Sequence, residues 1–399
     1  MWTLDPTITF LNHGSFGACP VPVLDEQSRW RARLESEPVR FMMRELEPAM
    51  DAVRARLGAF LGCSPEELAW VPNATSGVNT VLRSLQLKPG DEVLTTDHAY
   101  NACANALRFD AERTGAKVVV AKVPFPLGAP DQVTRAVLGA VTARTRFALL
   151  DHITSPTGLV FPIEAMIAGL HARGVEVMID GAHGPGMVPL SLTALGADWY
   201  TGNLHKWVCA PKGAAFLWVP LARQAALRPL VISHGANAAR TDRSRFRIEF
   251  DWTGTVDPTP WLCVPKALDT LAACEPGGWP EVMAKNRALA LEARALLASA
   301  LGVETPAPAE MIGALAALPL PGSVAGPGAL PGSGSLDPLQ DHLFTEHQIE
   351  VPVFSWPGDG KRLIRIAAQR YNARADYERL ARALVPPGSE RTSGFRPPY

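Results

Sequence analysis

Short runs of apolar residues recur through the middle of the chain, and within each run the apolar positions follow one another instead of alternating with polar ones. Strands that are apolar on both faces are typical of a parallel sheet buried between helices. Stretches with apolar residues three or four positions apart separate several runs, for example at 132–141 and 164–173. The pattern predicts strands at Leu68–Pro72, Glu92–Thr96, Lys117–Val123, Thr145–Leu150, Val175–Ile179, Ala197–Thr201 and Ala214–Val219.

This alternation of strands and helices predicts an α/β fold with a mainly parallel seven-stranded sheet between helices. After Trp261, further helical stretches and a later strand predict a smaller α+β domain. A tract rich in glycine and proline within it predicts a mobile loop. The predicted organisation is an N-terminal loop and helical arm at 1–60, a large α/β domain at 61–260, a small α+β domain at 261–385 with the Gly/Pro-rich loop at 319–335, and a tail at 386–399.

The first sixty residues show a different pattern. Two helices broken near Pro38 are predicted between Val23 and Leu61, because apolar residues recur there at helical spacing. A long arm ahead of the first core strand commonly packs on a neighbouring chain, so it indicates a dimer. Before the arm, Gly14 and Gly17 allow a close backbone approach to a ligand or to another chain, although a plain entry turn is the simpler interpretation.

Composition narrows the class of protein. Of the 399 residues 19% are charged and the formal net charge is −1, so no overall field attracts nucleic acid or an anionic membrane. Six scattered cysteines, without a C-x-x-C pair, argue against a disulfide framework and a structural metal and favour a reducing compartment. Neither a signal-like N-terminus nor a bilayer-length apolar run is present. We expect a soluble, cytoplasmic protein with no metal and no nucleic-acid or membrane partner.

Polar residues follow several predicted strands, at the edge where ligands bind in open α/β sheets. After the first strand, Thr75 and Ser76 can offer hydroxyls and helix N-terminal amides to a phosphate, or one of them can cap the helix without any ligand. After the second strand, His98 and Tyr100 bring aromatic rings to the same edge.

Lys206 follows the strand Ala197–Thr201, with polar neighbours on one side and Trp207 on the other. A partly desolvated lysine is unprotonated part of the time and can then react with an aldehyde. Asp180, at the end of the strand Val175–Ile179, can keep a pyridine ring protonated. Together with a phosphate cup and a stacking ring, these side chains meet the requirements of pyridoxal phosphate (PLP).

Eight segments carry a family resemblance: Leu11–Gly17, Asn73–Ser76, Asp97–Tyr100, Ser155–Gly158, Asp180–His183, Asn203–Trp207, Asp251–Thr255 and Arg365–Asn372. On these segments, which span nearly the whole chain, the sequence resembles the class V aminotransferase family of fold-type I PLP enzymes, and within it the isopenicillin N epimerase-like branch. The resemblance implies that Lys206 is the Schiff-base lysine and Asp180 the partner of the pyridine nitrogen. It also implies that His183, with or without Ser155, contacts the phenolic oxygen of the ring.

The resemblance assigns the remaining matched positions as well. It places the phosphate on Thr75, Ser76, Asn203 and His205. Either His98 or Tyr100 would lie over the ring, and the sequence does not decide between them. Thr255 would reach the phosphate of the other subunit, which implies a homodimer with shared active sites. Arg365 would grip the carboxylate of a small amino-acid substrate, with Asn12 and His13 also at the substrate.

The reaction is the least determined part. Cysteine desulfurases of the family carry a nucleophilic cysteine before the carboxylate-binding arginine, and 350–364 contains none. We therefore expect an epimerase or racemase acting at Cα of an amino acid or peptide-like substrate, with a C–S β-lyase, an aminotransferase and a PLP-binding protein of little turnover as alternatives. The second proton donor is open among His13, Tyr100 and His234. The basic run 240–247, with Arg240, Arg243, Arg245 and Arg247, is interpreted as a solvated face, with contact between one of these arginines and a distal substrate carboxylate as the alternative.

Overall fold

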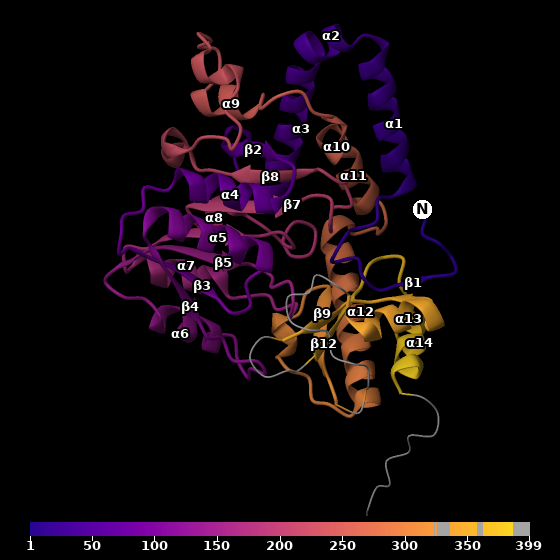
Figure 1. Cartoon of the computed structure of the whole chain (residues 1–399). Coiled ribbons are helices and arrows are strands. Elements are labelled where there is room, and N and C mark those ends of the chain that lie inside the picture. The colour runs from indigo at the N-terminus through magenta and orange to yellow at the C-terminus, as the bar shows by residue number, and fades with distance from the viewer. Residues whose placement is uncertain (323, 325–335, 357–361, 386–399) are drawn as a thin grey trace, which may run out of the picture.

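The computed structural model describes residues 1–322, 324, 336–356 and 362–385. Most of the predicted Gly/Pro-rich loop 319–335 and all of the predicted tail 386–399 lie outside these residues. The described chain forms a large α/β layered part, a helical arm at the N-terminal side and a smaller sheet with helices at the C-terminal side (Figure 1).

The central sheet contains seven strands in the order β2-β8-β7-β6-β5-β3-β4, and it confirms the predicted α/β fold class. The strands are β2 (Leu68–Val71), β3 (Glu92–Thr96), β4 (Lys117–Ala121), β5 (Thr145–Asp151), β6 (Glu176–Asp180), β7 (Trp199–Asn203) and β8 (Ala215–Trp218). Strand β8 alone runs antiparallel to its neighbours β2 and β7, because the chain returns directly from β7 through the loop 204–214 without a crossover helix. That loop carries Lys206, so the lysine lies at the carboxyl end of the parallel strands.

Helices cover both faces of this sheet, which explains why the strands are apolar throughout. Helices α4 (Ala74–Ser84) and α5 (Asn101–Thr114) pack on one face with buried residues of β2, β5 and β6. Helices α6 (Asp131–Gly139) and α7 (Ile163–His171) pack on the opposite face. Most strand side chains therefore lose contact with water whichever face they point to, as in other parallel sheets, whereas the edge strand β4 stays partly exposed.

The N-terminal arm consists of α1 (Val21–Ser36), α2 (Pro38–Arg40), a π-helical turn (Phe41–Glu45) and α3 (Leu46–Leu61). Figure 1 shows the chain rising along α1, turning over at α2 and returning along α3. The predicted break near Pro38 is confirmed: Glu37 has an extended ψ of 89°, and Pro38 opens the next helix. The helices α10 (Thr259–Leu262) and α11 (Val264–Ala272) pack against this arm.

The C-terminal part is an antiparallel sheet in the order β11-β12-β9, formed by β9 (Leu315–Leu320), β11 (Val353–Ser355) and β12 (Arg362–Ala367). Helices α12 (Gly278–Leu301), α13 (Pro338–His347) and α14 (Arg374–Leu384) accompany it. The short strand β1 (Thr9–Phe10) pairs in parallel with β10 (Ile349–Glu350), so the N-terminal segment is fastened to this part of the fold.

The remaining described helices are short: α8 (Leu192–Leu195), α9 (Arg245–Phe250), and 3-10 turns at Pro65–Glu67, Leu221–Ala226, His234–Asn237 and Ala309–Met311. Within the part of the chain that the structure describes, no helix has both the length and the apolar character needed to cross a membrane.

Candidate active site

Lys206 lies on the loop between β7 and β8, which is closed by hydrogen bonds from the Leu204 and His205 amides to the Ala214 carbonyl at 3.0 and 3.2 Å. Its Nζ is 3.2 Å from His183 Nε2. Burial, and next the positive charge of Arg365, lowers the pKa of Lys206 to about 8. Part of the amine is therefore unprotonated near neutral pH, which a nucleophilic lysine requires.

His183 is a neutral partner of this amine. The Trp207 indole N–H, which can only donate, is 3.2 Å from His183 Nδ1, so the proton of the neutral ring resides on Nε2 and points toward Lys206 Nζ. Burial, followed by the charges of Lys206 and Arg365, lowers the pKa of His183 well below its usual range. The ring therefore donates a hydrogen bond to an unprotonated Lys206.

Asp180 ends β6 and is almost fully buried. Its Oδ1 accepts the Ala182 N–H at 3.0 Å, and its Oδ2 accepts the Cys103 thiol at 3.0 Å. Asp151 ends β5 directly opposite Asp180 in the strand register, on the same face of the sheet. Burial, and next the charge of Asp180, raises the pKa of the Asp151 carboxyl well above its usual range. Neither Cys103 nor Asp151 is among the site residues predicted from the sequence, although the position of Asp151 at the end of the adjacent strand is a usable signal.

The first turn of α4 lies beside the Lys206 loop. Asn73, not Thr75 or Ser76, caps this helix: its Oδ1 accepts the Ser76 N–H at 2.8 Å and the Ser76 Oγ–H at 3.0 Å. The interpretation of Thr75 or Ser76 as the cap is therefore wrong. Asn203 Oδ1 accepts the Ala74 N–H at 2.8 Å, and His205 Nδ1 donates to the Ala214 carbonyl at 2.9 Å, which leaves His205 Nε2 available.

Close contact between α4 and β7 holds this turn in place. A Cβ at Gly77 would collide with the side chain of Thr201, so only glycine lets the helix approach the strand so closely. The helix N-terminus, Asn203 and His205 thus meet near Lys206, in an arrangement suited to an anionic group.

His98 and Tyr100 have different surroundings. His98 is fully buried, its Nδ1 2.8 Å from Thr157 Oγ1 and its Nε2 3.3 Å from the Val123 carbonyl. Burial lowers its pKa to about 4. Tyr100 is 44% exposed at the start of α5. Burial, and then the charges of Cys103 and Asp180, raises the pKa of Tyr100, so its phenol stands within electrostatic reach of Asp180.

Arg365, on β12, is a buried cation surrounded by neutral groups. Its Nη1 donates to the Ser155 carbonyl at 2.6 Å and to Ser155 Oγ at 3.2 Å, and its Nη2 donates to Ser15 Oγ at 3.0 Å and to Asn12 Oδ1 at 3.5 Å. Its Nε is buried without a partner among the described residues. Burial lowers the pKa of Arg365 to about 10. Because a buried guanidinium is costly without an anion, this position suits a carboxylate.

Asn12 and His13, the other predicted substrate residues, contact Arg365 and the Lys206 backbone respectively. Asn12 Nδ2 donates to Glu350 Oε1 at 2.8 Å while its Oδ1 receives the bond from Arg365. His13 is fully buried, with Nε2 3.1 Å from the Lys206 carbonyl. Ser155 contacts Arg365 in this structure. The structure thus brings Asn12 and Ser155 to Arg365, and His13 to the backbone of Lys206.

Thr255 is exposed, in the segment 252–256 that lies next to the arm. Its neighbours Thr253 and Val256 line a groove of about 560 Å³, together with Met42, Met43, Leu46, Met50, Trp70, Trp252 and Trp261. His234 lines the same groove. The groove is bounded by the arm helices and by the segment 252–256, and its lining is mainly apolar.

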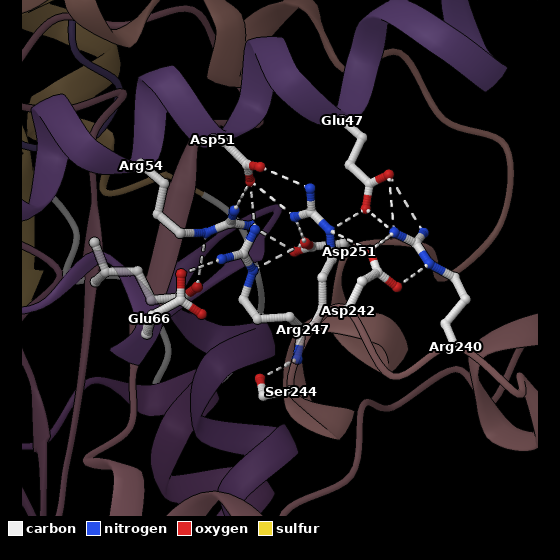
Figure 2. Close-up of polar contacts among 11 residues, drawn as sticks. Glu47, Asp51, Arg54, Glu66, Arg240, Asp242, Ser244, Arg247 and Asp251 are labelled. Carbon is white, nitrogen blue, oxygen red and sulfur yellow. Dashed lines mark hydrogen bonds and ion pairs between the residues drawn. The ribbon is translucent and has the colours of Figure 1, made fainter.

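The interpretation of the basic run 240–247 as a solvated face is wrong for Arg243 and Arg247, whereas Arg240 and Arg245 are exposed. Arg247 is buried and pairs with Asp251 at 3.0 Å and with Glu66 at 2.8 Å, while Arg243 pairs with Asp51 of α3 at 2.7 Å. Figure 2 shows the Arg247 guanidinium between the carboxylates of Glu66, Asp51 and Asp251. The acidic partners Asp51 and Glu66 come from distant parts of the sequence, so the run by itself, which is rich in arginine, does not reveal these ion pairs.

Arg54 of α3 completes this network. It is fully buried and bonds both Asp251 and Asp51, and it also donates to the Leu68 carbonyl at 3.1 Å. The network therefore ties the arm to the residue that begins the segment 251–255 (Figure 2).

The mixed seven-stranded sheet, with a buried lysine on the loop that reverses the chain between β7 and β8, defines a fold-type I α/β protein. The family model for aminotransferase class-V matches residues 19–322, and the chain belongs to this family. It is 37% identical over 396 residues to an isopenicillin N epimerase of Amycolatopsis lactamdurans, with 96% of each chain covered. It is 30% identical over 401 residues to a probable chloroplastic L-cysteine desulfhydrase of Arabidopsis thaliana, covering 95% of this chain and 83% of that one.

Among solved structures, the cystine C–S lyase C-DES in complex with cysteine persulfide has a TM-score of 0.77 at 19% identity, covering 95% of this chain and 97% of that chain. A variant of C-DES holds glycine covalently linked to its PLP cofactor. At this identity the likeness concerns the fold, and it confirms the predicted fold-type I architecture.

Proposed function

We propose that the chain is a PLP-dependent enzyme that acts at Cα of an amino acid, with Lys206 as the lysine that binds the cofactor aldehyde. The observation that carries this proposal is the meeting of a buried amine, 3.2 Å from a neutral His183, with a buried carboxylate and a buried cation that lacks an anionic partner among the described residues. Such a combination is costly for stability and is characteristic of a functional site.

The described residues fit the cofactor group by group. Asp180 would bind the pyridine nitrogen, and His183 the phenolic oxygen. Thr75, Ser76, Asn203 and His205 would hold the phosphate at the first turn of α4. Of the two rings that the sequence left open, we assign the position over the cofactor to Tyr100, because His98 is fully buried and its ring packs among Phe125, Phe161 and Trp356.

Bound PLP lowers the cost of removing the proton from Cα of an attached amino acid. The chain's own residues would do the rest. Arg365 would hold the substrate carboxylate through the free edge of its guanidinium, which orients Cα. The Lys206 amine, with a pKa of about 8, would take the Cα proton. The hydrogen bond from His183 Nε2–H to this amine would hold the amine in place beside Cα.

We infer an epimerase-like reaction as the first candidate, supported by the 37% identity to an isopenicillin N epimerase. Inversion needs an acid on the face opposite Lys206. His13 is buried behind Lys206, and His234 lines the groove at the arm, so Tyr100 is the remaining candidate of the three. Its raised pKa keeps the phenol protonated and able to donate.

A C–S β-lyase is the second candidate, since a relative at 30% identity is a probable L-cysteine desulfhydrase. β-Elimination needs Cα deprotonation by Lys206 and a sulfur leaving group, but no acid on the opposite face. An aminotransferase is the third candidate.

We further propose a homodimer with shared sites. The groove between the arm and the segment 252–256 is apolar, and Met43 and Val256 at its rim are 72% and 51% exposed. A second copy of the chain seated there would cover these side chains and receive Thr255 at its own phosphate cup.

One experiment separates these candidates. The purified protein, supplied with PLP, is incubated in deuterated water with amino acids, peptide-like amines and S-substituted cysteines, and product mass and chirality are read together, with Lys206→Ala as the control. Deuterium at Cα with inversion and no cleavage of the substrate identifies an epimerase, and pyruvate with a released sulfur species identifies a lyase. Protein that gains no mass at Lys206 after PLP and borohydride treatment would overturn the proposal.

A further inference from the structure

The N-terminal loop Leu11–Gly17 touches both ends of the proposed site. On one side, Asn12 and Ser15 receive hydrogen bonds from Arg365. On the other side, His13 lies 3.1 Å from the Lys206 carbonyl, and a Cβ at Gly17 would lie 2.5 Å from the same carbonyl oxygen. A single short loop therefore contacts both the backbone of Lys206 and the guanidinium of Arg365.

His13 is the most enclosed member of this loop. Its ring is fully buried and lies 4.9 Å from the Trp207 ring, measured between centroids. Its Nδ1 is 2.8 Å from the Tyr371 hydroxyl and 3.4 Å from the Ala18 amide. These contacts join segments 193 and 358 residues away in sequence from His13.

The hydrogen-bond partners fix which nitrogen carries the proton. The Ala18 N–H can only donate, so Nδ1 is an acceptor, and the Lys206 carbonyl can only accept, so Nε2 carries the hydrogen. The Gln369 amide nitrogen, 3.3 Å from Nε2, has an alternative acceptor in Cys209 Sγ at 3.6 Å.

His13 keeps this tautomer over the working pH range. Burial, with further contributions from the charges of Lys212 and Lys206, lowers its pKa to about 3. A ring that stays neutral, and whose nitrogens both bond protein groups, exchanges no proton with a substrate.

We propose that His13 is a positioning residue: its Nε2–H fixes the Lys206 carbonyl and so sets where the Lys206 amine stands relative to Arg365. The Lys206 carbonyl accepts one other bond, from the Cys209 amide at 3.0 Å, and Cys209 has a left-handed φ of 59° that the surrounding contacts must hold. Loss of the His13 bond would let this strained turn relax and let water reach the amine.

This inference rests on the proposed function in one respect, that Lys206 is the reactive amine. Tyr371 and Gln369 follow β12, the strand that carries Arg365, so the same histidine also links the carboxylate side of the site to the lysine loop. Movement of β12 and its following loop would then be transmitted to Lys206 through one imidazole.

Three substitutions at one position test the idea. His13→Gln places an amide N–H near the position of Nε2, whereas His13→Asn places it near Nδ1, and His13→Leu has no donor. Tyr371→Phe removes the hydroxyl that faces Nδ1. The full-length protein without added cofactor is labelled with an amine-specific acylating reagent over a series of pH values, and the Lys206-containing peptide is quantified by mass spectrometry. Guanidinium unfolding is measured in parallel.

We expect the pH midpoint for Lys206 labelling to stay near 8 in His13→Gln and to rise by about one unit in His13→Asn and His13→Leu, which is about tenfold less free amine at pH 7. Equal midpoints in the Gln and Asn variants would overturn the proposal, even if both are less stable, because a purely structural role lowers stability without separating them. If His13→Leu does not fold, the Gln and Asn pair still decides. The labelling requires neither PLP nor substrate, so its outcome is distinct from failure of the proposed function.

Discussion

Gly17 gives a steric test of how tightly the lysine loop is held. A Cβ at this position would lie 2.5 Å from the Lys206 carbonyl oxygen, 2.6 Å from the His205 carbonyl oxygen and 2.9 Å from Lys206 Cα. All three are backbone atoms, so no side-chain rotation relieves the contact. Ordinary van der Waals separation requires an opening of about 0.9 Å. Gly17→Ala must therefore displace either the N-terminal loop or the loop that carries Lys206.

The expected cost follows from this displacement. Overpacking of a well-packed region costs about 1–3 kcal/mol, and a shift of about 1 Å at a reacting group lowers the rate by about 100-fold. We therefore expect Gly17→Ala to lower the free energy of unfolding by about 2 kcal/mol and to slow the formation of a borohydride-trappable PLP adduct at Lys206 by at least tenfold. Guanidinium unfolding and mass spectrometry measure the two effects.

Gly139 provides the matched control. It lies in helix α6, where an added Cβ meets no atom within 4 Å, so Gly139→Ala should stabilise the chain by about 0.5–1 kcal/mol and leave adduct formation unchanged. If Gly17→Ala formed the adduct at the rate of Gly139→Ala, the lysine loop would not be held by this contact, and the argument for a rigid site would fail.

Three further outcomes are expected. The pKa of Lys206 falls from 10.5 to about 8 on folding, so between these pH values the folded chain binds fewer protons than the unfolded chain. The free energy of unfolding should therefore rise as pH increases from about 8 to 10.5, and this gain is absent below pH 8. Lys206→Met should flatten the rise in guanidinium unfolding of the cofactor-free protein. Arg54→Met removes one guanidinium partner of Asp251, which keeps Arg247, and should cost about 1.5–3 kcal/mol. Arg56→Met, which breaks an exposed pair on the same helix, should cost less than about 1 kcal/mol by the same assay. Tyr100→Phe should retain deuterium exchange at Cα and slow inversion by at least about tenfold if the enzyme is an epimerase; undiminished inversion, read by chiral chromatography, would exclude the phenol as the second acid.

The sequence predicts the parts of the fold that depend on local pattern. The strands of the central sheet are apolar on both faces, so their positions follow from burial alone, within one or two residues of the observed ends. The direction of β8 depends on how the chain returns from β7, and no pattern within β8 encodes it. Pairing between β1 and β10 joins residues more than three hundred positions apart, which periodicity cannot predict.

The same limit applies to the candidate site. Lys206 and Asp180 could be proposed because the polar residues at strand ends must share one edge of the sheet. The burial of His98 and the exposure of Tyr100 after β3 depend on distant partners such as Thr157, which no local pattern encodes, so the sequence offers no ground for choosing between the two rings. The Cys103 thiol reaches Asp180 from the first turn of α5, and a helix pattern predicts burial of this residue but not the atom that it contacts.

The pairing of β1 with β10 has a consequence for biosynthesis. A ribosome makes the N-terminal loop first and the strand that fastens it more than three hundred residues later. Until that strand emerges, His13 lacks Tyr371 and Arg365 is not yet made, although the central sheet can already fold. A nascent chain would thus present the Lys206 loop before Arg365 and the His13 partner Tyr371 exist, and a chaperone or free PLP could meet the lysine in that interval.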